Sequence, residues 1–176
     1  MMHRRTKQAL ALTLAAGAVA ALPAGASAKT WKAGTTDPTG DGPVPGRDIT
    51  DVKFRYKSNG SVLFVVTTAG PIDGTNADAA VGVSLGATCS KPLLSGGGVF
   101  SQPDPTVFFT IKGKKLGKNR KGEGEITNNV YTLQTKQSAF KNWKPGCFAV
   151  VLLDPATADS ATPTVFDETG EIKIKK

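Results

Sequence analysis

Residues 51–69, DVKFRYKSNGSVLFVVTTA, decide the fold. In the first half of this stretch, apolar side chains alternate with basic ones, and this period of two predicts a strand with one buried face. Asn59-Gly60 follows, a pair that tolerates the positive φ angles of a tight hairpin turn. The second half is apolar at nearly every position, as in a strand at the centre of a sheet. The stretch therefore predicts an antiparallel β-hairpin.

The rest of the chain shows the same short period of two and no sustained helical period. Further strands are predicted at 80–87, 106–112, 124–127, 129–136, 147–154, 164–166 and 171–175. Short strands at this spacing, with Gly and Pro between them, are typical of an all-β antiparallel β-sandwich, immunoglobulin-like or jelly-roll-like. A β-barrel is the alternative.

The composition divides the chain into three parts. Residues 1–28 combine three early cations with an apolar run and end in Ala26-Ser27-Ala28, which predicts a secretory signal peptide cleaved after Ala28. A retained membrane anchor is the alternative, but the apolar run is short for a span. Residues 29–47 are expected to form an irregular arm, and 48–176 a single sandwich domain. Segments 90–104 and 154–163 are also expected to be irregular.

Cleavage after Ala28 would remove the only histidine, His3, and both methionines. It would also lower the formal net charge from +8 to +5. Without histidine, the Ser-His and Cys-His nucleophile pairs and the commonest zinc ligand are excluded. We therefore expect a protein that is not an enzyme. A hydrolase that uses a pair of carboxylates remains a third interpretation, because it needs no histidine.

Two cysteines remain after cleavage, Cys89 and Cys147. In an oxidising compartment outside the cytoplasm they are expected to form one disulfide. The chain-entropy model assigns about 4 kcal/mol to closing such a loop. From the sequence, the bridge joins either neighbouring segments or the two sheets.

The segment 37–48 has the ligand spacing of a calcium loop. Oxygen-bearing side chains stand at its first, third, fifth and twelfth positions, Asp37, Thr39, Asp41 and Asp48, and Gly42 is sixth. Ca²⁺ prefers six to eight hard oxygen ligands, and a glycine at the sixth position allows the sharp turn of such loops. A structural calcium ion is the cofactor that this spacing predicts.

The same segment departs from the calcium-loop pattern in two ways. Its twelfth residue is Asp rather than a bidentate Glu, and three prolines stiffen it. No helix is expected on either side. The alternative interpretation is therefore a surface arm rich in Asx turns and prolines.

A family resemblance rests on the same region. The Asp-x-x-Gly-Asp segment, the following Asp-Ile and the alternating hairpin resemble the opening of family 9 carbohydrate-binding-like and DOMON-like domains. The matching residues are Asp37, Gly40, Asp41, Asp48 and Ile49, followed by 52–69. The resemblance implies a secreted β-sandwich with a structural calcium ion near the sheet edge. It assigns no sugar-binding aromatic residue to a position in this chain.

Two tryptophans, Trp31 and Trp143, lie in segments expected to be loops. Either ring has the shape to stack on a sugar. The alternative is that each ring plugs one end of the sandwich core.

The most basic stretch is KGKKLGKNRKG, residues 112–122. Its cations are Lys112, Lys114, Lys115, Lys118, Arg120 and Lys121. Such a run indicates contact with a polyanion, for example an acidic envelope polysaccharide, or else a solvated loop that protects a sheet edge.

Taken together, the sequence predicts a secreted, non-catalytic binding or structural module of unknown ligand, stabilised by calcium. The alternative is an extracellular polyanion-binding protein acting through the basic hairpin 112–121. Apart from the signal peptide, no stretch of the chain is long and apolar enough to span a membrane.

Overall fold

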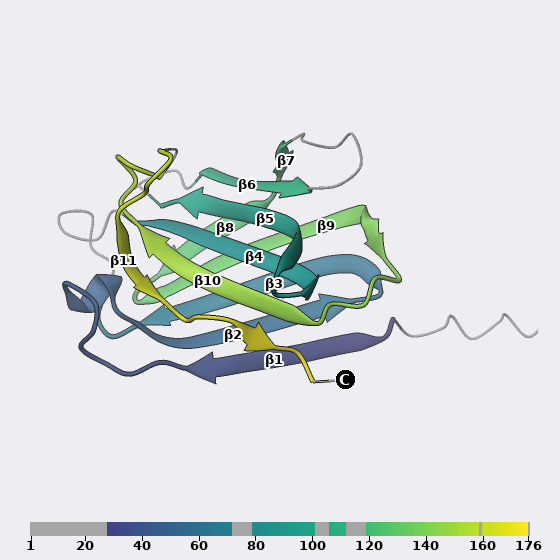
Figure 1. Ribbon diagram of the computed structural model, residues 1–176, viewed down its shortest axis with the longest axis horizontal. Helices are drawn as coiled ribbons and strands as arrows, with labels where there is room; N and C mark the ends of the chain where they lie inside the picture. The colour runs from purple at the N-terminus through teal and green to yellow at the C-terminus, as the bar shows by residue number, and fades with distance from the viewer. Residues whose placement is uncertain (1–27, 72–78, 101–105, 112–118, 159, 176) are drawn as a thin grey trace, which may run out of the picture.

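The computed structural model describes residues 28–71, 79–100, 106–111, 119–158 and 160–175. These residues form two antiparallel sheets that pack as two layers (Figure 1). The five-stranded sheet has the order β1 (Thr30–Thr36), β2 (Ile49–Lys57), β3 (Asn59–Thr68), β9 (Val130–Lys141), β8 (Glu123–Thr127). A single 3₁₀ turn in the described chain, η1 (Pro45–Arg47), precedes β2.

The second sheet has seven strands. Its order is β11 (Val165–Glu168), β10 (Cys147–Leu153), β4 (Ala80–Thr88), β5 (Lys91–Val99), β6 (Thr106–Ile111), β7 (Asn119–Lys121), with β12 (Ile172–Lys173) also beside β10. The chain passes between the two sheets three times, from β3 to β4, from β7 to β8 at Gly122, and from β9 to β10.

The hairpin predicted at 51–69 is confirmed as β2 and β3. The two strands pair antiparallel, with Phe54 opposite Phe64. Gly60 has a φ of 91°, and a Cβ atom there would lie 2.2 Å from the carbonyl oxygen of Gln137. Only glycine fits this turn, because a side chain would be strained in the left-handed region and would also clash.

Aromatic rings from both sheets meet in one core. Phe54 and Phe64 lie with ring centroids 5.2 Å and 6.0 Å from that of Phe148 on β10. The two layers therefore pack face to face, which confirms the predicted sandwich over the barrel alternative. The largest fully buried side chains are Tyr56, Tyr131, Phe54, Phe64, Phe100, Phe109, Phe140, Phe148, Ile49, Leu85, Leu94 and Leu133.

The expected irregular arm 29–47 needs correction, because Thr30–Thr36 forms the edge strand β1. This strand pairs with β2 from Thr30 opposite Lys57 to Thr36 opposite Asp51. Its inward side chains, Trp31 and Ala33, are only partly buried. Because the strand lies at the edge of the sheet, few of its side chains are apolar. The sequence pattern alone therefore did not predict a strand here.

The segment 90–104 was also expected to be irregular, yet it contains strand β5. This strand includes three consecutive glycines, Gly96, Gly97 and Gly98, and pairs with β4 on one side and β6 on the other. Ladder hydrogen bonds on both edges hold a glycine-rich backbone that has little strand propensity of its own.

The predicted disulfide Cys89–Cys147 is present, with Cα atoms 5.0 Å apart. Cys89 follows β4 directly and Cys147 begins β10, and these two strands are neighbours in the seven-stranded sheet. Of the two alternatives left open by the sequence, the bridge therefore joins neighbouring strands rather than the two sheets.

The predicted signal peptide lies almost wholly outside the described residues, as do positions 112–118 of the basic stretch. Within the described part of the chain, no helix has the length and apolar character needed to cross a membrane.

Candidate metal centre

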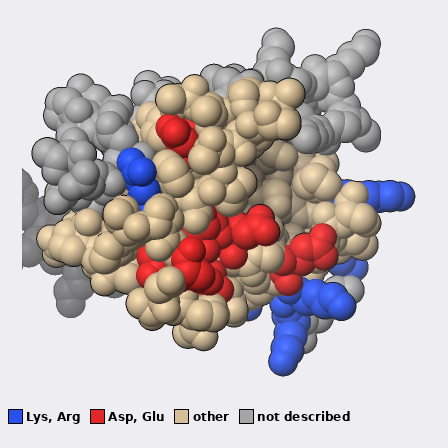
Figure 2. All heavy atoms as spheres, turned by 60° about the vertical axis from the view of Figure 1, so that its left-hand side comes forward, with Lys and Arg blue, Asp and Glu red and all other residues tan. Residues whose placement is uncertain are grey.

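Three aspartates meet at one end of the sandwich. Asp41 and Asp48 come from the loop between β1 and β2, and Asp167 comes from β11 in the other sheet. One carboxylate oxygen of each lies within 4.8 Å of the other two. Figure 2 turns the left-hand side of Figure 1 forward and shows acidic side chains gathered on this end of the molecule. We call Asp41, Asp48 and Asp167 the acidic triad.

The loop reaches this position because it folds back tightly on Asp48. The backbone N–H of Gly40 donates a 2.7 Å hydrogen bond to Oδ2 of Asp48. Gly42 lies so close that a Cβ atom there would be 2.5 Å from the carbonyl oxygen of Arg47 and 2.6 Å from the Cα of Asp48. Glycine at this position therefore permits the close approach that brings Asp41 beside Asp48.

Asp48 is almost completely enclosed, with 3% of its surface exposed. Its carbonyl oxygen accepts a 2.8 Å hydrogen bond from the N–H of Ala69, at the end of β3. Its Oδ1 atom is buried and has no hydrogen-bond partner. A buried carboxylate oxygen without a partner carries a large desolvation cost, so it indicates that something else satisfies this atom.

Asp167 connects the triad to the backbone of both sheets. Its Oδ2 accepts a 2.5 Å hydrogen bond from the N–H of Ile49 in β2, and its Oδ1 accepts a 2.7 Å bond from the N–H of Glu168. Beside it, the Phe166 ring lies under the guanidinium of Arg47, whose Cζ is 4.2 Å from the ring centroid. These contacts hold β11 against the loop.

The electrostatics of the site oppose full ionisation. Burial raises the pKa of Asp37, and the charges of Asp167, Asp41 and Asp48 raise it further. Burial also raises the pKa of Asp167, and Asp41 and Asp48 add to this effect, while hydrogen bonds from Ile49 and Glu168 act in the opposite direction. The Oδ2 atom of Asp37 is buried and lacks a hydrogen-bond partner. The carboxyl group of Asp37 therefore interacts electrostatically with the three carboxyl groups of the triad.

Such an arrangement could hold a hard cation. Ca²⁺ binds carboxylate oxygens at 2.3–2.6 Å, so two ligands on opposite sides of the ion are about 4.6–5.2 Å apart. The triad oxygens lie within 4.8 Å of one another, a separation that leaves room for one such ion between them. A divalent cation would also neutralise the mutual repulsion of these carboxylates.

The structure brings together only part of the predicted ligand set. Asp41 and Asp48 belong to the triad, and Asp37 lies close enough to interact with it electrostatically. Thr39 is exposed, and its role as a ligand stays a prediction. Asp167 was missed, because the sequence placed it in a turn after 164–166. No local pattern in the sequence marks a partner more than a hundred positions away.

The two tryptophans pack against the core, Trp31 from the edge strand β1 rather than from a loop, and Trp143 from the segment after β9. Trp31 and Trp143 are half-buried, and their ring centroids lie 5.1 Å and 6.2 Å from that of Tyr56. This packing matches the core-plug interpretation of both residues. Stacking of either ring on a sugar stays a prediction.

Comparison of the chain with protein-family models, with curated proteins and with solved structures gives no match. The resemblance to calcium-containing β-sandwich modules therefore rests on the fold and on the acidic residues alone.

Proposed function

We propose that the protein is a non-catalytic binding or structural module outside the cytoplasm, and that one Ca²⁺ ion stabilises its fold. The ion would bind the acidic triad, with Asp37 as a further carboxylate beside it. The observation that carries this proposal is the buried Oδ1 of Asp48, which lacks a hydrogen-bond partner and belongs to the triad. The disulfide fits a location outside the cytoplasm.

A structural role for the triad is favoured over a hydrolytic one. Carboxyl pairs of glycosidases stand about 5–5.5 Å or 6.5–9.5 Å apart, so that a sugar or a water fits between them. The triad oxygens are closer, within 4.8 Å, and Asp48 and Asp167 are buried and bonded to backbone N–H groups.

Thermal unfolding with and without Ca²⁺ tests the proposal. At a Ca²⁺ concentration of 100 times Kd, linkage predicts a gain of about 2.7 kcal/mol. For a chain of this size the gain corresponds to a rise in Tm of about 5–10 °C. Circular dichroism of the purified protein, first freed of metal and then titrated with Ca²⁺, measures this shift.

Matched variants locate the ion. Asp48→Asn and Asp167→Asn are expected to abolish the rise in Tm, because each removes one triad carboxylate. Glu168→Gln removes a neighbouring exposed charge outside the triad and is expected to keep the rise. Equal melting curves with and without Ca²⁺, or a rise that survives in Asp48→Asn, would show that the triad is not a calcium site.

A further inference from the structure

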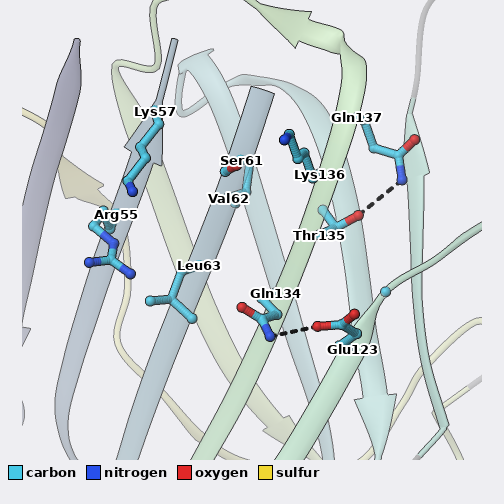
Figure 3. Close-up of a pocket in the computed structure, with 11 residues that line it drawn as sticks. Arg55, Lys57, Ser61, Val62, Leu63, Glu123, Gln134, Thr135, Lys136 and Gln137 are labelled. Carbon is cyan, nitrogen blue, oxygen red and sulfur yellow. Dashed lines mark hydrogen bonds between the residues drawn. The ribbon is translucent and has the colours of Figure 1, made fainter. Parts of the chain in front are cut away.

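A groove of about 700 Å³ lies on the outer face of the five-stranded sheet, away from the acidic triad. Its lining residues come from β2, β3, β8 and β9 and from Gly122. Figure 3 shows Arg55 and Lys57 of β2 and Lys136 of β9 among the side chains at this groove. We call it the cationic groove.

The sheet register fixes how the cations are spaced. Lys57 pairs with Ser61 of β3, and Ser61 pairs with Lys136 of β9, so all three side chains leave the same face in one row. Neighbouring strands are about 4.8 Å apart, which places the backbones of Lys57 and Lys136 about 10 Å apart. Arg55 lies two residues from Lys57 on the same face, about 7 Å along the strand.

The cations of the groove are available to a ligand. Within the described residues, the side chains of Arg55, Lys57 and Lys136 form no ion pair or hydrogen bond. The carboxylate in the lining, Glu123, already accepts a 2.7 Å hydrogen bond from the side-chain amide of Gln134. Among the lining residues that the structure describes, three cationic side chains without an ion pair thus outnumber one carboxylate that already accepts a hydrogen bond, so this face attracts anions.

Other lining groups suit a sugar chain. Leu63 supplies apolar surface in the row next to Ser61, and the side chains of Ser61, Gln134 and Gln137 carry hydroxyl and amide groups at the same groove. Hydroxyl and amide groups both donate and accept hydrogen bonds, as the hydroxyls of a sugar require.

We propose that the cationic groove binds an anionic polysaccharide, a chain of sugar units that carries carboxylate or sulfate groups. Among the described residues no aromatic ring lines the groove, so these residues offer no stacking surface of the kind that single-stranded nucleic acids use. The groove is concave, whereas a bilayer surface is flat on this scale. Of the described residues of the basic stretch 112–122, only Gly122 lines the groove, and the cations of the groove, Arg55, Lys57 and Lys136, come from β2 and β9.

Binding of two polysaccharides to matched variants tests this assignment. Heparin carries sulfate and carboxylate groups, and polygalacturonate carries carboxylates alone. The triple variant Arg55→Gln, Lys57→Gln, Lys136→Gln is expected to lose about tenfold or more in affinity for at least one of them. The control, Lys91→Gln, Lys173→Gln, Lys175→Gln, removes the same charge from β5, β12 and the residues just after β12, and it is expected to change affinity less than twofold.

Further measurements distinguish this proposal from a net-charge effect, from binding of other polyanions and from binding through the basic stretch. Binding should weaken as salt screens the charges, and the triple variant should unfold at the same temperature as the parent, because its side chains lie on the surface. Equal losses in the two triple variants would show a net-charge effect and overturn the proposal. So would tighter binding of single-stranded DNA or of anionic phospholipid vesicles, or a loss seen only in Lys114→Gln, Lys115→Gln, Lys118→Gln. None of these readouts depends on Ca²⁺ binding by the triad.

Discussion

The carboxylate of Asp48 is the main reason for proposing a bound cation. One of its carboxylate oxygens is held by the N–H of Gly40, and the other is buried without a partner, next to Asp41 and Asp167. Burying an oxygen without a hydrogen-bond partner costs desolvation free energy, and neighbouring carboxylates repel one another, so this arrangement does not by itself favour folding. A bound cation would offset both effects, since the oxygen without a hydrogen bond would coordinate it and its positive charge would neutralise the cluster.

The raised pKa values of Asp37 and Asp167 predict a pH dependence. The folded, metal-free protein binds these protons more tightly than the unfolded chain does. The contribution of both groups to the free energy of unfolding is therefore highest in acid, and it falls as pH rises from their ordinary pKa of 3.8 through the raised values. Ca²⁺ would replace the protons, so the difference in Tm between calcium-loaded and metal-free protein is expected to grow from pH 4 to pH 7.

Calorimetry at several pH values, with Ca²⁺ and with metal-free protein, measures this trend. In Asp167→Asn the calcium-dependent difference should be absent at every pH. A difference that is larger at pH 4 than at pH 7 would contradict the coupling of protons and cation at the triad.

Among the strands, the sequence best predicted those whose apolar and polar side chains alternate along the chain. The hairpin β2–β3 follows from the pattern of 51–69, because both a buried face and a turn signal are present in one short stretch. Strand β1 and the glycine-rich β5 were missed, because tertiary pairing stabilises each of them more than its own residues do. The acidic triad joins elements that lie far apart in sequence. Ligand spacing along the chain therefore predicted Asp41 and Asp48 but not Asp167.

The disulfide gives a prediction at the same scale. It joins the end of β4 to the start of β10 across a sequence separation of 58 residues. The double variant Cys89→Ser, Cys147→Ser is expected to lower the free energy of unfolding by about 4 kcal/mol, through the greater freedom of its unfolded chain. Urea unfolding of the variant and of the parent measures the difference. A loss below about 1 kcal/mol would show that pairing of β4 with β10 alone holds this part of the sheet.

For the whole molecule, the triad links the two layers of the sandwich. Asp41 and Asp48 lie in the loop that leads into the five-stranded sheet, whereas Asp167 belongs to β11 of the seven-stranded sheet. A bound ion would therefore add a contact between the layers at one end, beyond the apolar core between them.

Hydrogen exchange can detect this linkage. Ca²⁺ is expected to slow exchange together in the loop 37–48 and in β11, two segments that lie far apart in sequence. The hairpin turn 58–60 lies at the opposite end of β2 and β3 from Asp48 and should change less. Protection confined to the loop would show that Asp167 is not a ligand.

The path of the chain places both ends of the described structure away from the triad. β1 begins at the right of Figure 1 and runs toward the acidic end, and β12 pairs with the start of β10, whereas β11 and Asp167 pair with its end. A tether, reporter or support attached through either end would therefore leave the acidic end of the sandwich pointing outward. Single-molecule or surface-immobilised measurements can then deliver Ca²⁺ to its proposed site without obstruction by the attachment.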